Sequence, residues 1–167
     1  MSVLFFDHCV GKSIPEALRR LNPPARIKYW QKQFRRTTEH RGDKHWIPIV
    51  ARQGWIIISF DSKFREREAE LRAMVDSSAG CFCYWGGNAT TWVRFKLLAR
   101  TLDRVLQLAN STPRPFLFRV DRRGRIRQLQ LPPAAELRGA PPQVAAEHDN
   151  CYFLKDSRTP GSNTCSP

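Results

Sequence analysis

Three aspartates stand where a chain of alternating strands and helices would gather acidic side chains. Asp7 follows the apolar run at residues 3–6, Asp61 follows the run at residues 56–60, and Asp43 stands where a helix is predicted to begin. Carboxylates grouped in this way repel one another and are held together most readily by Mg²⁺ or Mn²⁺, which prefer oxygen ligands. Because such an ion polarises a phosphate and lowers the pKa of a bound water, the pattern indicates hydrolysis of phosphodiester bonds.

Each of these acids also has a purely structural interpretation. Asp43 would serve as the N-cap of its helix, and Asp7 and Asp61 would serve as turn residues. The spacing leaves both interpretations open.

The elements that position the acids follow from hydrophobic patterning. Apolar runs that lack polar alternation predict buried strands at residues 3–6 and 56–60, and further strands are predicted at 25–31 and 80–86. Helices are predicted at residues 14–21, 43–54, 62–78 and 88–110, and a hairpin at 115–131 that turns around residues 122–124. Strands that alternate with helices imply a mainly parallel sheet, and ligands bind at the carboxyl edge of such a sheet.

Two finer expectations concern helix ends and faces. Ser13 and Glu16 have the spacing of a capping box. Helical spacing in the segment 88–110 predicts one apolar face, formed by Trp92, Phe95, Leu98, Leu102, Val105 and Leu106.

Composition predicts one folded domain over residues 1–131 and a disordered tail over residues 132–167. Six of the 12 prolines fall in the last 36 residues, which contain few large aliphatic side chains. The tail carries three Lys and Arg and four Asp and Glu, so residues 1–131 hold 25 basic and 11 acidic groups, a net charge of +14. This charge favours nucleic acid as the partner, with an acidic protein or a merely solvated basic surface as alternatives.

The N-terminal sequence has neither the basic region of a signal peptide nor an apolar run long enough to span a membrane. We therefore expect a cytoplasmic protein without a membrane partner. Its five cysteines are expected to be reduced, and the pair Cys81 and Cys83 is expected to be buried thiols because no second pair completes a metal site.

Basic residues flank the three acids along the chain. Those predicted to bind RNA phosphates are Lys12, Arg35, Arg36, Arg41, Lys44, Arg52 and Arg65. Nearby aromatic residues could stack on the bases of single-stranded RNA; these are Tyr29, Trp30, Phe34 and Trp46, of which Trp46 fits core packing better. His8, His40 and His45 are weaker candidates for proton transfer.

The segments "FFDHCVGKSIPEALRRL", "GDKHWIPIVARQGWIIISFDSKF" and "EREAEL…AGCFCYW" resemble the PIN-like superfamily, in particular the VapC-type toxin ribonucleases and their PIN-like relatives. The resemblance covers roughly residues 3–109. It implies a three-layer α/β/α PIN-like domain with a central, mainly parallel sheet, to which the predicted hairpin and tail are additions. It also implies a metal-dependent endoribonuclease that uses Mg²⁺ or Mn²⁺, with Asp7, Asp43 and Asp61 as catalytic metal ligands. The implied partners are RNA and a cognate antitoxin, and a homodimer stays open.

One departure from the family pattern concerns the residues after the strand at 56–60. Related sequences often read D-x-D-F there, whereas this chain reads "DSKF" and places Lys63 where a fourth acid would stand. Lys63 could act catalytically by neutralising the scissile phosphate, or it could mark a weakened metal site. Substitutes for the missing acid are Glu39, Glu66, Glu68 and Asp76, among which Glu68 is favoured as the fourth metal ligand.

Two rival functions follow from the same residues. One is a catalytically weakened RNA-binding protein that kept the basic groove after Lys63 replaced an acid. The other is a phosphohydrolase of the haloacid dehalogenase type, because "FFD" resembles the nucleophile strand of that family. That type requires an aspartate two residues further on, where this chain has Cys9.

Overall fold

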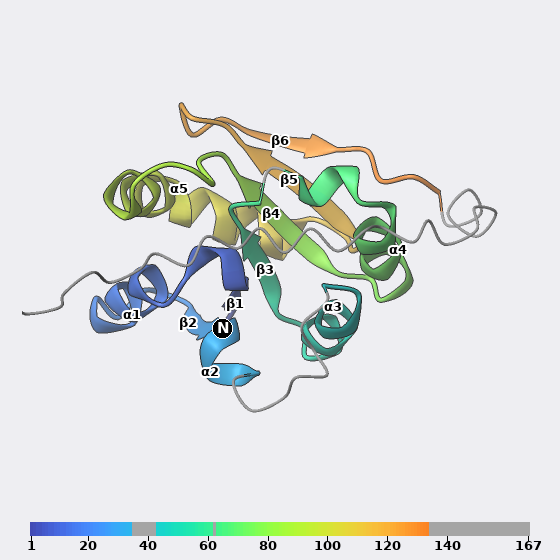
Figure 1. The fold of residues 1–167 in the computed structure, drawn as a ribbon, viewed down its shortest axis with the longest axis horizontal. Helices are drawn as coiled ribbons and strands as arrows, with labels where there is room; N and C mark the ends of the chain where they lie inside the picture. The colour runs from blue at the N-terminus through green and yellow to red at the C-terminus, as the bar shows by residue number, and fades with distance from the viewer. Residues whose placement is uncertain (35–42, 62, 134–167) are drawn as a thin grey trace, which may run out of the picture.

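The computed structural model describes residues 1–34, 43–61 and 63–133. Its centre is a six-stranded sheet with the strand order β2-β1-β3-β4-β5-β6 (Figure 1). Five strands are parallel: β1 Val3–Phe6, β2 Arg26–Tyr29, β3 Ile56–Ser59, β4 Gly80–Tyr84 and β5 Phe116–Val120. The sixth strand, β6 Ile126–Leu129, is antiparallel to β5 and forms one edge.

Helices connect the parallel strands. They are α1 Ser13–Arg20, α2 Trp30–Gln33, α3 Asp43–Arg52, α4 Glu68–Asp76 and α5 Thr91–Ser111, with the 3-10 turns η1 His8–Val10 and η3 Phe64–Glu66. Because each crossover returns to start a parallel strand, all five parallel strands end at the same edge of the sheet, which we call the carboxyl edge. The opposite edge, where these strands begin, is the amino edge.

The two faces of the sheet carry separate cores. Phe6, Ile58 and Phe118 point to the face that is covered by α1 and α5, together with Leu18 and Leu98 of those helices. Phe5, Ile57 and Cys81 point to the other face, where they pack with Trp46 of α3 and Met74 of α4. Both sides of every central strand are therefore buried, which explains why these strands read as uninterrupted apolar runs. The predicted three-layer α/β/α domain with a mainly parallel sheet is confirmed.

Three local predictions need correction. The capping box is absent, because Lys12 rather than Ser13 occupies the N-cap position and Glu16 accepts a hydrogen bond from the Tyr29 hydroxyl at 3.0 Å. The helix predicted over residues 62–78 is divided into η3 and α4, since Arg67 adopts an extended backbone between them (φ −95°, ψ 107°).

The third correction concerns the first turn of α5. Trp92 was expected on the apolar face, yet 63% of it is exposed and its ring stacks on Phe95 with centroids 5.9 Å apart. Trp92 is the second residue of α5, in the first turn of the helix. Further along, Leu98, Leu102 and Val105 are buried as predicted.

The hairpin predicted at residues 115–131 forms, and its two strands differ in role. β5 extends the parallel sheet beside β4, whereas β6 is the antiparallel edge strand. The predicted boundary at residue 131 and the tail from residue 132 fall almost wholly outside the described residues. In the described part of the chain, no helix is long and apolar enough to cross a membrane.

Candidate active site

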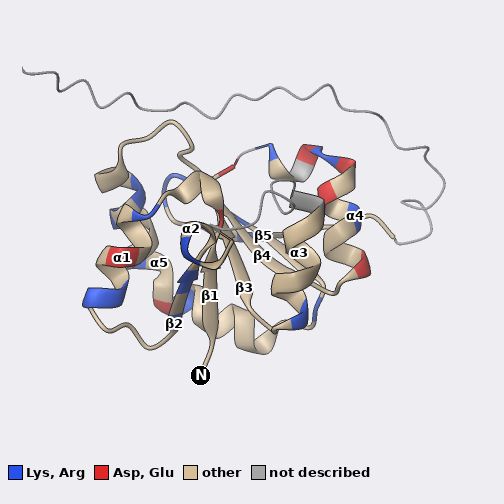
Figure 2. Cartoon of the chain, turned by 60° about the horizontal axis from the view of Figure 1, so that its bottom comes forward, with Lys and Arg blue, Asp and Glu red and all other residues tan. Residues whose placement is uncertain are grey.

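Asp7 lies directly after β1, at the carboxyl edge, and only 1% of it is exposed. Its backbone N–H donates to the Ile58 carbonyl at 3.0 Å, which continues the β1–β3 ladder by one residue. The apolar run of β1 thus carries an acidic side chain directly from the core to the carboxyl edge. Figure 2 shows this edge at the top, with β1 rising towards it from the N-terminus.

The Asp7 carboxylate is surrounded by hydrogen-bond donors. Oδ1 accepts from the His8 backbone N–H and lies 2.6 Å from His8 Nδ1, while Oδ2 accepts from Cys9 Sγ at 3.1 Å and from Ser59 Oγ at 3.0 Å. Burial raises the pKa of Asp7, but the hydrogen bond and charge of His8, with the bonds from Cys9 and Ser59, outweigh burial and hold this pKa below its ordinary value. Asp7 is therefore a buried carboxylate at neutral pH.

Cys9 contributes as a neutral donor. Burial, followed by the negative charge of Asp7, raises the pKa of the Cys9 thiol well above its ordinary value. The thiol consequently keeps its proton, which it shares with the Asp7 carboxylate.

Asp61 lies two residues beyond β3 at the same edge and is half-buried. Its Oδ1 accepts from the Lys63 backbone N–H at 2.8 Å, and its Oδ2 lies 3.0 Å from Arg67 Nη2. Its own backbone N–H donates to Ser59 Oγ at 3.1 Å. Asp61 is thus held by a turn on one side and by a guanidinium on the other.

Ser59 joins the two aspartates and was missed by the sequence analysis. Its hydroxyl donates to Asp7 and accepts from the Asp61 backbone, and it is fully buried. One signal in the sequence could have revealed it, namely a hydroxyl residue that ends an otherwise apolar strand two positions before an acid.

Arg67 and Glu70 form a second feature that the sequence did not reveal. Arg67 lies between two acids, because Nη1 is 2.6 Å from Glu70 Oε1 while Nη2 contacts Asp61. Glu70 is only 5% exposed, although it lies on the helix α4. Glu68, the predicted fourth ligand, instead lies 3.2 Å from Arg72 Nη2 in an ion pair. The buried acid that shares a partner with Asp61 is therefore Glu70.

For Asp43 the structure describes the backbone, and for Lys63 it describes an exposed residue. Asp43 is the first residue of α3, whose other end leads into the start of β3, so its backbone lies towards the carboxyl edge. The side chains of Asp43, Lys44 and Arg65 lie outside the described part. Lys63 is exposed and follows Asp61 at this edge.

The basic residues predicted to bind RNA are not gathered at one place. Lys12 is exposed beyond η1, near the end of β1. Arg52 ends α3 at the amino edge, away from Asp7 and Asp61, and its Nε donates to the Pro48 carbonyl at 3.3 Å. Arg35, Arg36 and Arg41 lie outside the described residues.

The aromatic residues proposed for base stacking serve mainly in the core. Tyr29, Phe34 and Trp46 are buried, so base stacking by these three is wrong, and the preference for core packing of Trp46 is confirmed. Among the histidines, His8 contacts Asp7, His45 is exposed on α3, and His40 lies outside the described residues.

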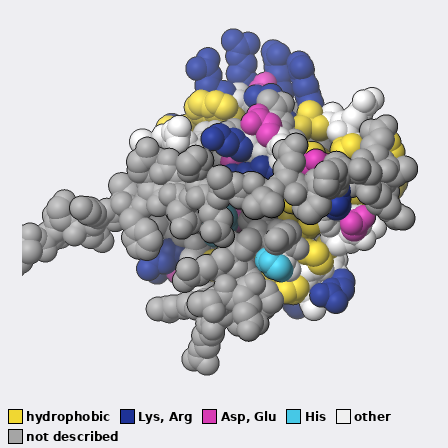
Figure 3. Space-filling view, turned by 45° about the vertical axis from the view of Figure 1, so that its right-hand side comes forward, with side chains coloured by type: hydrophobic (Ala, Val, Ile, Leu, Met, Phe, Trp, Pro, Cys, Tyr) yellow, Lys and Arg dark blue, Asp and Glu magenta, His cyan; other side chains and the backbone are white. Residues whose placement is uncertain are grey.

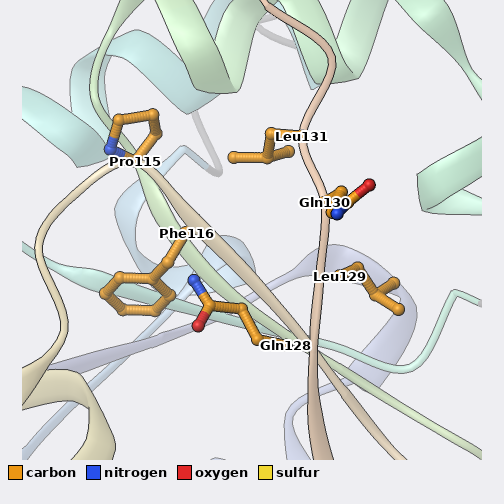
Figure 4. A pocket seen from close by; sticks show the side chains of 6 residues that line it. All are labelled: Pro115, Phe116, Gln128, Leu129, Gln130 and Leu131. Carbon is orange, nitrogen blue, oxygen red and sulfur yellow. The ribbon is translucent and has the colours of Figure 1, made fainter.

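Two surface depressions lie apart from the aspartates. One is lined by Glu16, Arg19, Arg20 and Tyr29. The other lies where β5 begins and β6 ends, at the amino edge, and is lined by apolar and amide side chains (Figure 4). Neither contains Asp7 or Asp61, and the second has no titratable side chain.

The donor set at the carboxyl edge suits a hard divalent cation better than a softer metal. Asp7 and Asp61 offer carboxylate oxygens, the ligands that Mg²⁺ and Mn²⁺ prefer. Within the described residues, no group of three or more His, Cys, Asp or Glu side chains is close enough together to hold a metal ion. Two carboxylates are thus defined here, and Asp43 begins α3, the helix that precedes β3 in the chain.

Comparison with known proteins connects this edge to a family. The family model described as "PIN like domain" matches residues 2–85, the segment that runs from β1 through β4 and contains both aspartates. A protein of Mycobacterium tuberculosis (strain ATCC 25618 / H37Rv) that carries the name of a ribonuclease, VapC45, is 27% identical over 124 residues. That alignment covers 70% of this chain and 84% of the relative. No solved structure matches the chain.

Proposed function

The chain belongs to the PIN-like domain family, and from this premise we propose that it is a divalent-metal-dependent endoribonuclease, the toxin of a type II toxin-antitoxin pair. The similarity to a relative named as a ribonuclease supports the choice of RNA as the substrate. The net charge of +13 supports it as well, since a cationic protein attracts a polyanion.

The observation that carries this proposal is the link between Asp7 and Asp61 through Ser59. A buried carboxylate with a lowered pKa and a second, half-buried carboxylate lie at the ends of adjacent strands, at the edge where α/β proteins bind ligands. A purely structural pair of turn residues does not require the buried one to be ionised. The arrangement favours the catalytic interpretation of the two acids.

The residues that would hold the ion are Asp7, Asp43 and Asp61, with Glu68 or Glu70 as the fourth carboxylate. An ion bound there would polarise the phosphodiester and make water a better nucleophile. Ser59 and Cys9 orient Asp7, and the Lys63 backbone orients Asp61. Lys63 itself would place its ammonium group against the scissile phosphate.

Cleavage of a fluorescent RNA in Mg²⁺ or Mn²⁺ tests the proposal. Wild-type protein should cleave, excess chelator should abolish cleavage, and Asp7→Asn, Asp43→Asn and Asp61→Asn should each lower the rate by at least about 10²-fold, because each exchange removes an anionic ligand at nearly constant shape. Asp103→Asn is the matched control, since Asp103 is exposed on α5 and lies outside the aspartate pair.

Two outcomes would contradict the mechanism. Undiminished cleavage in chelator would exclude a metal ion. Binding of RNA without cleavage by wild-type protein in either metal would instead favour the weakened RNA-binding protein, an alternative supported by the guanidinium of Arg67 beside Asp61.

A toxin of this kind would act in the cytoplasm and would be neutralised by a small antitoxin. We expect the gene for such a partner beside the gene for this chain. Co-expression should yield a complex in which RNA cleavage is suppressed. A neighbourhood without a small acidic or DNA-binding protein would count against the toxin assignment while leaving the nuclease activity open to test.

A further inference from the structure

Five exposed arginines lie on the β5–β6 hairpin, and we call this feature the arginine hairpin. It consists of Arg119 on β5, Arg122, Arg123 and Arg125 in the turn, and Arg127 on β6. The hairpin lies outside the segment that matches the family model, which ends at residue 85. Figure 3 shows Lys and Arg side chains projecting side by side from the top of the molecule, the height at which Figure 1 draws the hairpin.

The five positive charges of this feature share the nearby carboxylate of Asp121, whose pKa is lowered by a backbone hydrogen bond from Arg125 and by the charges of Arg125 and Arg127. Arg119 stands directly opposite Arg127 in the strand register, and like charges at such a position destabilise a hairpin. The nearest acid in the chain, Asp121, accepts hydrogen bonds from the backbone N–H groups of Arg123 and Arg125. Within the described residues, no ion pair joins any of the five guanidiniums to an Asp or Glu. Five guanidiniums that share one nearby carboxylate leave a net positive surface, which suits an anionic ligand.

The turn of the hairpin is held in a defined position by α5. Arg100 Nη2 donates to the Arg122 carbonyl at 2.6 Å, and the Gly124 N–H donates to the Asp121 carbonyl at 2.9 Å. Gly124 has φ +82°, and an added Cβ would lie 3.1 Å from Thr101 Cγ2. The guanidiniums therefore project from a backbone that is ordered before any ligand binds, which lowers the entropic cost of binding.

The hairpin turn lies at the same edge of the sheet as the aspartates. β5 is parallel to β4 and β3, so its end belongs to the carboxyl edge together with Asp7 and Asp61. Two strand spacings, roughly 10 Å, separate β3 from β5. Trp85 follows β4 between them, is 38% exposed, and donates its backbone N–H to the Val120 carbonyl at 2.8 Å. A partly exposed tryptophan thus follows the strand that lies between β3, which leads to Asp61, and β5, which leads to the arginines.

We propose that the arginine hairpin is a second RNA-binding surface, which holds phosphates of the substrate strand at a distance from the bond being cleaved, with Trp85 as a stacking surface on the way. This inference rests on the proposed ribonuclease function, because that function supplies a polyanion at the same edge. Guanidiniums bind phosphates strongly and read no sequence, so the surface sets affinity and register rather than base preference.

Binding to a 20-nucleotide RNA in excess chelator tests the surface separately from cleavage, because the proposed cleavage requires a divalent ion whereas phosphate binding by guanidinium groups does not. The variant is the full chain with Arg122→Gln, Arg123→Gln and Arg125→Gln, which keeps the backbone hydrogen bonds of the turn. The control is the full chain with Arg19→Gln, Arg20→Gln and Arg26→Gln, three exposed arginines at the end of α1 and the start of β2 that give the same change in net charge. Circular dichroism and thermal melting verify that both variants are folded.

The turn variant should bind at least about tenfold more weakly than the control at 0.1 M salt, and the slope of log K against log salt should fall by about 2, as expected for three lost phosphate contacts. Equal affinities for the two variants would overturn the proposal. If the turn variant bound RNA normally but lost a protein partner, the hairpin would be a docking site for an acidic protein. If the turn variant bound RNA normally and differed from the control by aggregating at higher concentration, the arginines would serve to keep the edge strand β6 from pairing with another chain.

Cleavage of RNA of two lengths separates this proposal from the proposed function. For a 20-nucleotide substrate the turn variant should raise KM by about tenfold with little change in kcat, whereas for a tetranucleotide, too short to span both sites, KM should be unchanged. A failure of wild-type protein to cleave either RNA would contradict the nuclease function and leave the binding result intact. A loss of kcat for both lengths would overturn the hairpin proposal, because it would mean damage to the cleavage centre.

Discussion

The Ser59 hydroxyl donates to Asp7 Oδ2 at 3.0 Å across the β1–β3 strand pair. Ser59 Oγ also accepts a hydrogen bond from the Asp61 backbone N–H at 3.1 Å, so a neutral, fully buried side chain connects the two acids. A hydroxyl suits this position because it can donate to a carboxylate and accept from an amide at the same time.

Ser59→Ala should therefore affect both stability and catalysis. Loss of the hydroxyl leaves buried groups at Asp7 and Asp61 without one partner each, and we expect the free energy of unfolding to fall by about 1–2 kcal/mol. Cleavage should fall by about tenfold, since Asp7 loses one of the donors that fix its orientation. Urea denaturation and initial cleavage rates measure the two effects. Ser77→Ala is the control, because the Ser77 hydroxyl donates to the Ala73 carbonyl at the end of α4. Full activity of Ser59→Ala would show that the link is not needed.

Arg67 should weaken the affinity of Asp61 for a cation. Its guanidinium contacts both Asp61 and the buried Glu70. Arg67→Gln therefore removes the positive charge that reduces the repulsion between these two carboxylates, and a cation becomes more favourable there. We expect a lower Mn²⁺ concentration for half-maximal cleavage and a loss of about 1 kcal/mol in stability, a modest value because Arg67 is partly exposed. Arg104→Gln is the control, because Arg104 is exposed on α5 and its guanidinium donates to Gln107 rather than to an acid. An unchanged Mn²⁺ concentration for half-maximal cleavage would show that Arg67 does not affect metal binding.

Substitutions of Lys63 test whether its ammonium group neutralises the scissile phosphate or whether Lys63 stands in place of a fourth metal-binding acid. Its backbone N–H holds Asp61 and is kept in any substitution except proline, so side-chain variants report on the ammonium group alone. If the ammonium group stabilises the transition state, Lys63→Ala should lower kcat by something on the order of 10²-fold. Lys63→Asp should lower it further. If the site is instead a weakened four-acid cluster, Lys63→Asp should raise cleavage and tighten metal binding. Indifference to both changes would contradict both interpretations and direct attention to Glu68 and Glu70.

Deletion of residues 132–167 should leave RNA binding nearly unchanged. The deleted segment carries three basic and four acidic groups, so the remaining chain keeps a net charge of +14. The affinity for RNA and its salt dependence should change by less than about twofold, because both follow the number of phosphate contacts. A filter-binding titration at several salt concentrations measures this. A loss of about tenfold would make the segment part of the RNA site.

The sequence by itself determined the strands, the sheet type and the location of the aspartates. The apolar runs of β1 and β3 are buried on both faces, as expected for central strands of a parallel sheet. Their ends in Asp7 and Asp61 then follow from connectivity, because parallel strands must all finish at one edge. Helices with strong periodicity, such as the middle of α5, were predictable for the same reason.

The tertiary structure alone decided which side chains meet at that edge. Ser59 lies 52 residues from Asp7 in the chain, and the link between Glu70 and Asp61 depends on the extended residue Arg67, which local helix propensity argues against. Arg119 and Arg127 face each other only because the hairpin register pairs them. Trp92 was misplaced because helical spacing identifies a face but not which residues of that face the packing of the helix leaves exposed. Short-range patterns fix the elements, whereas contacts between distant residues depend on how those elements pack.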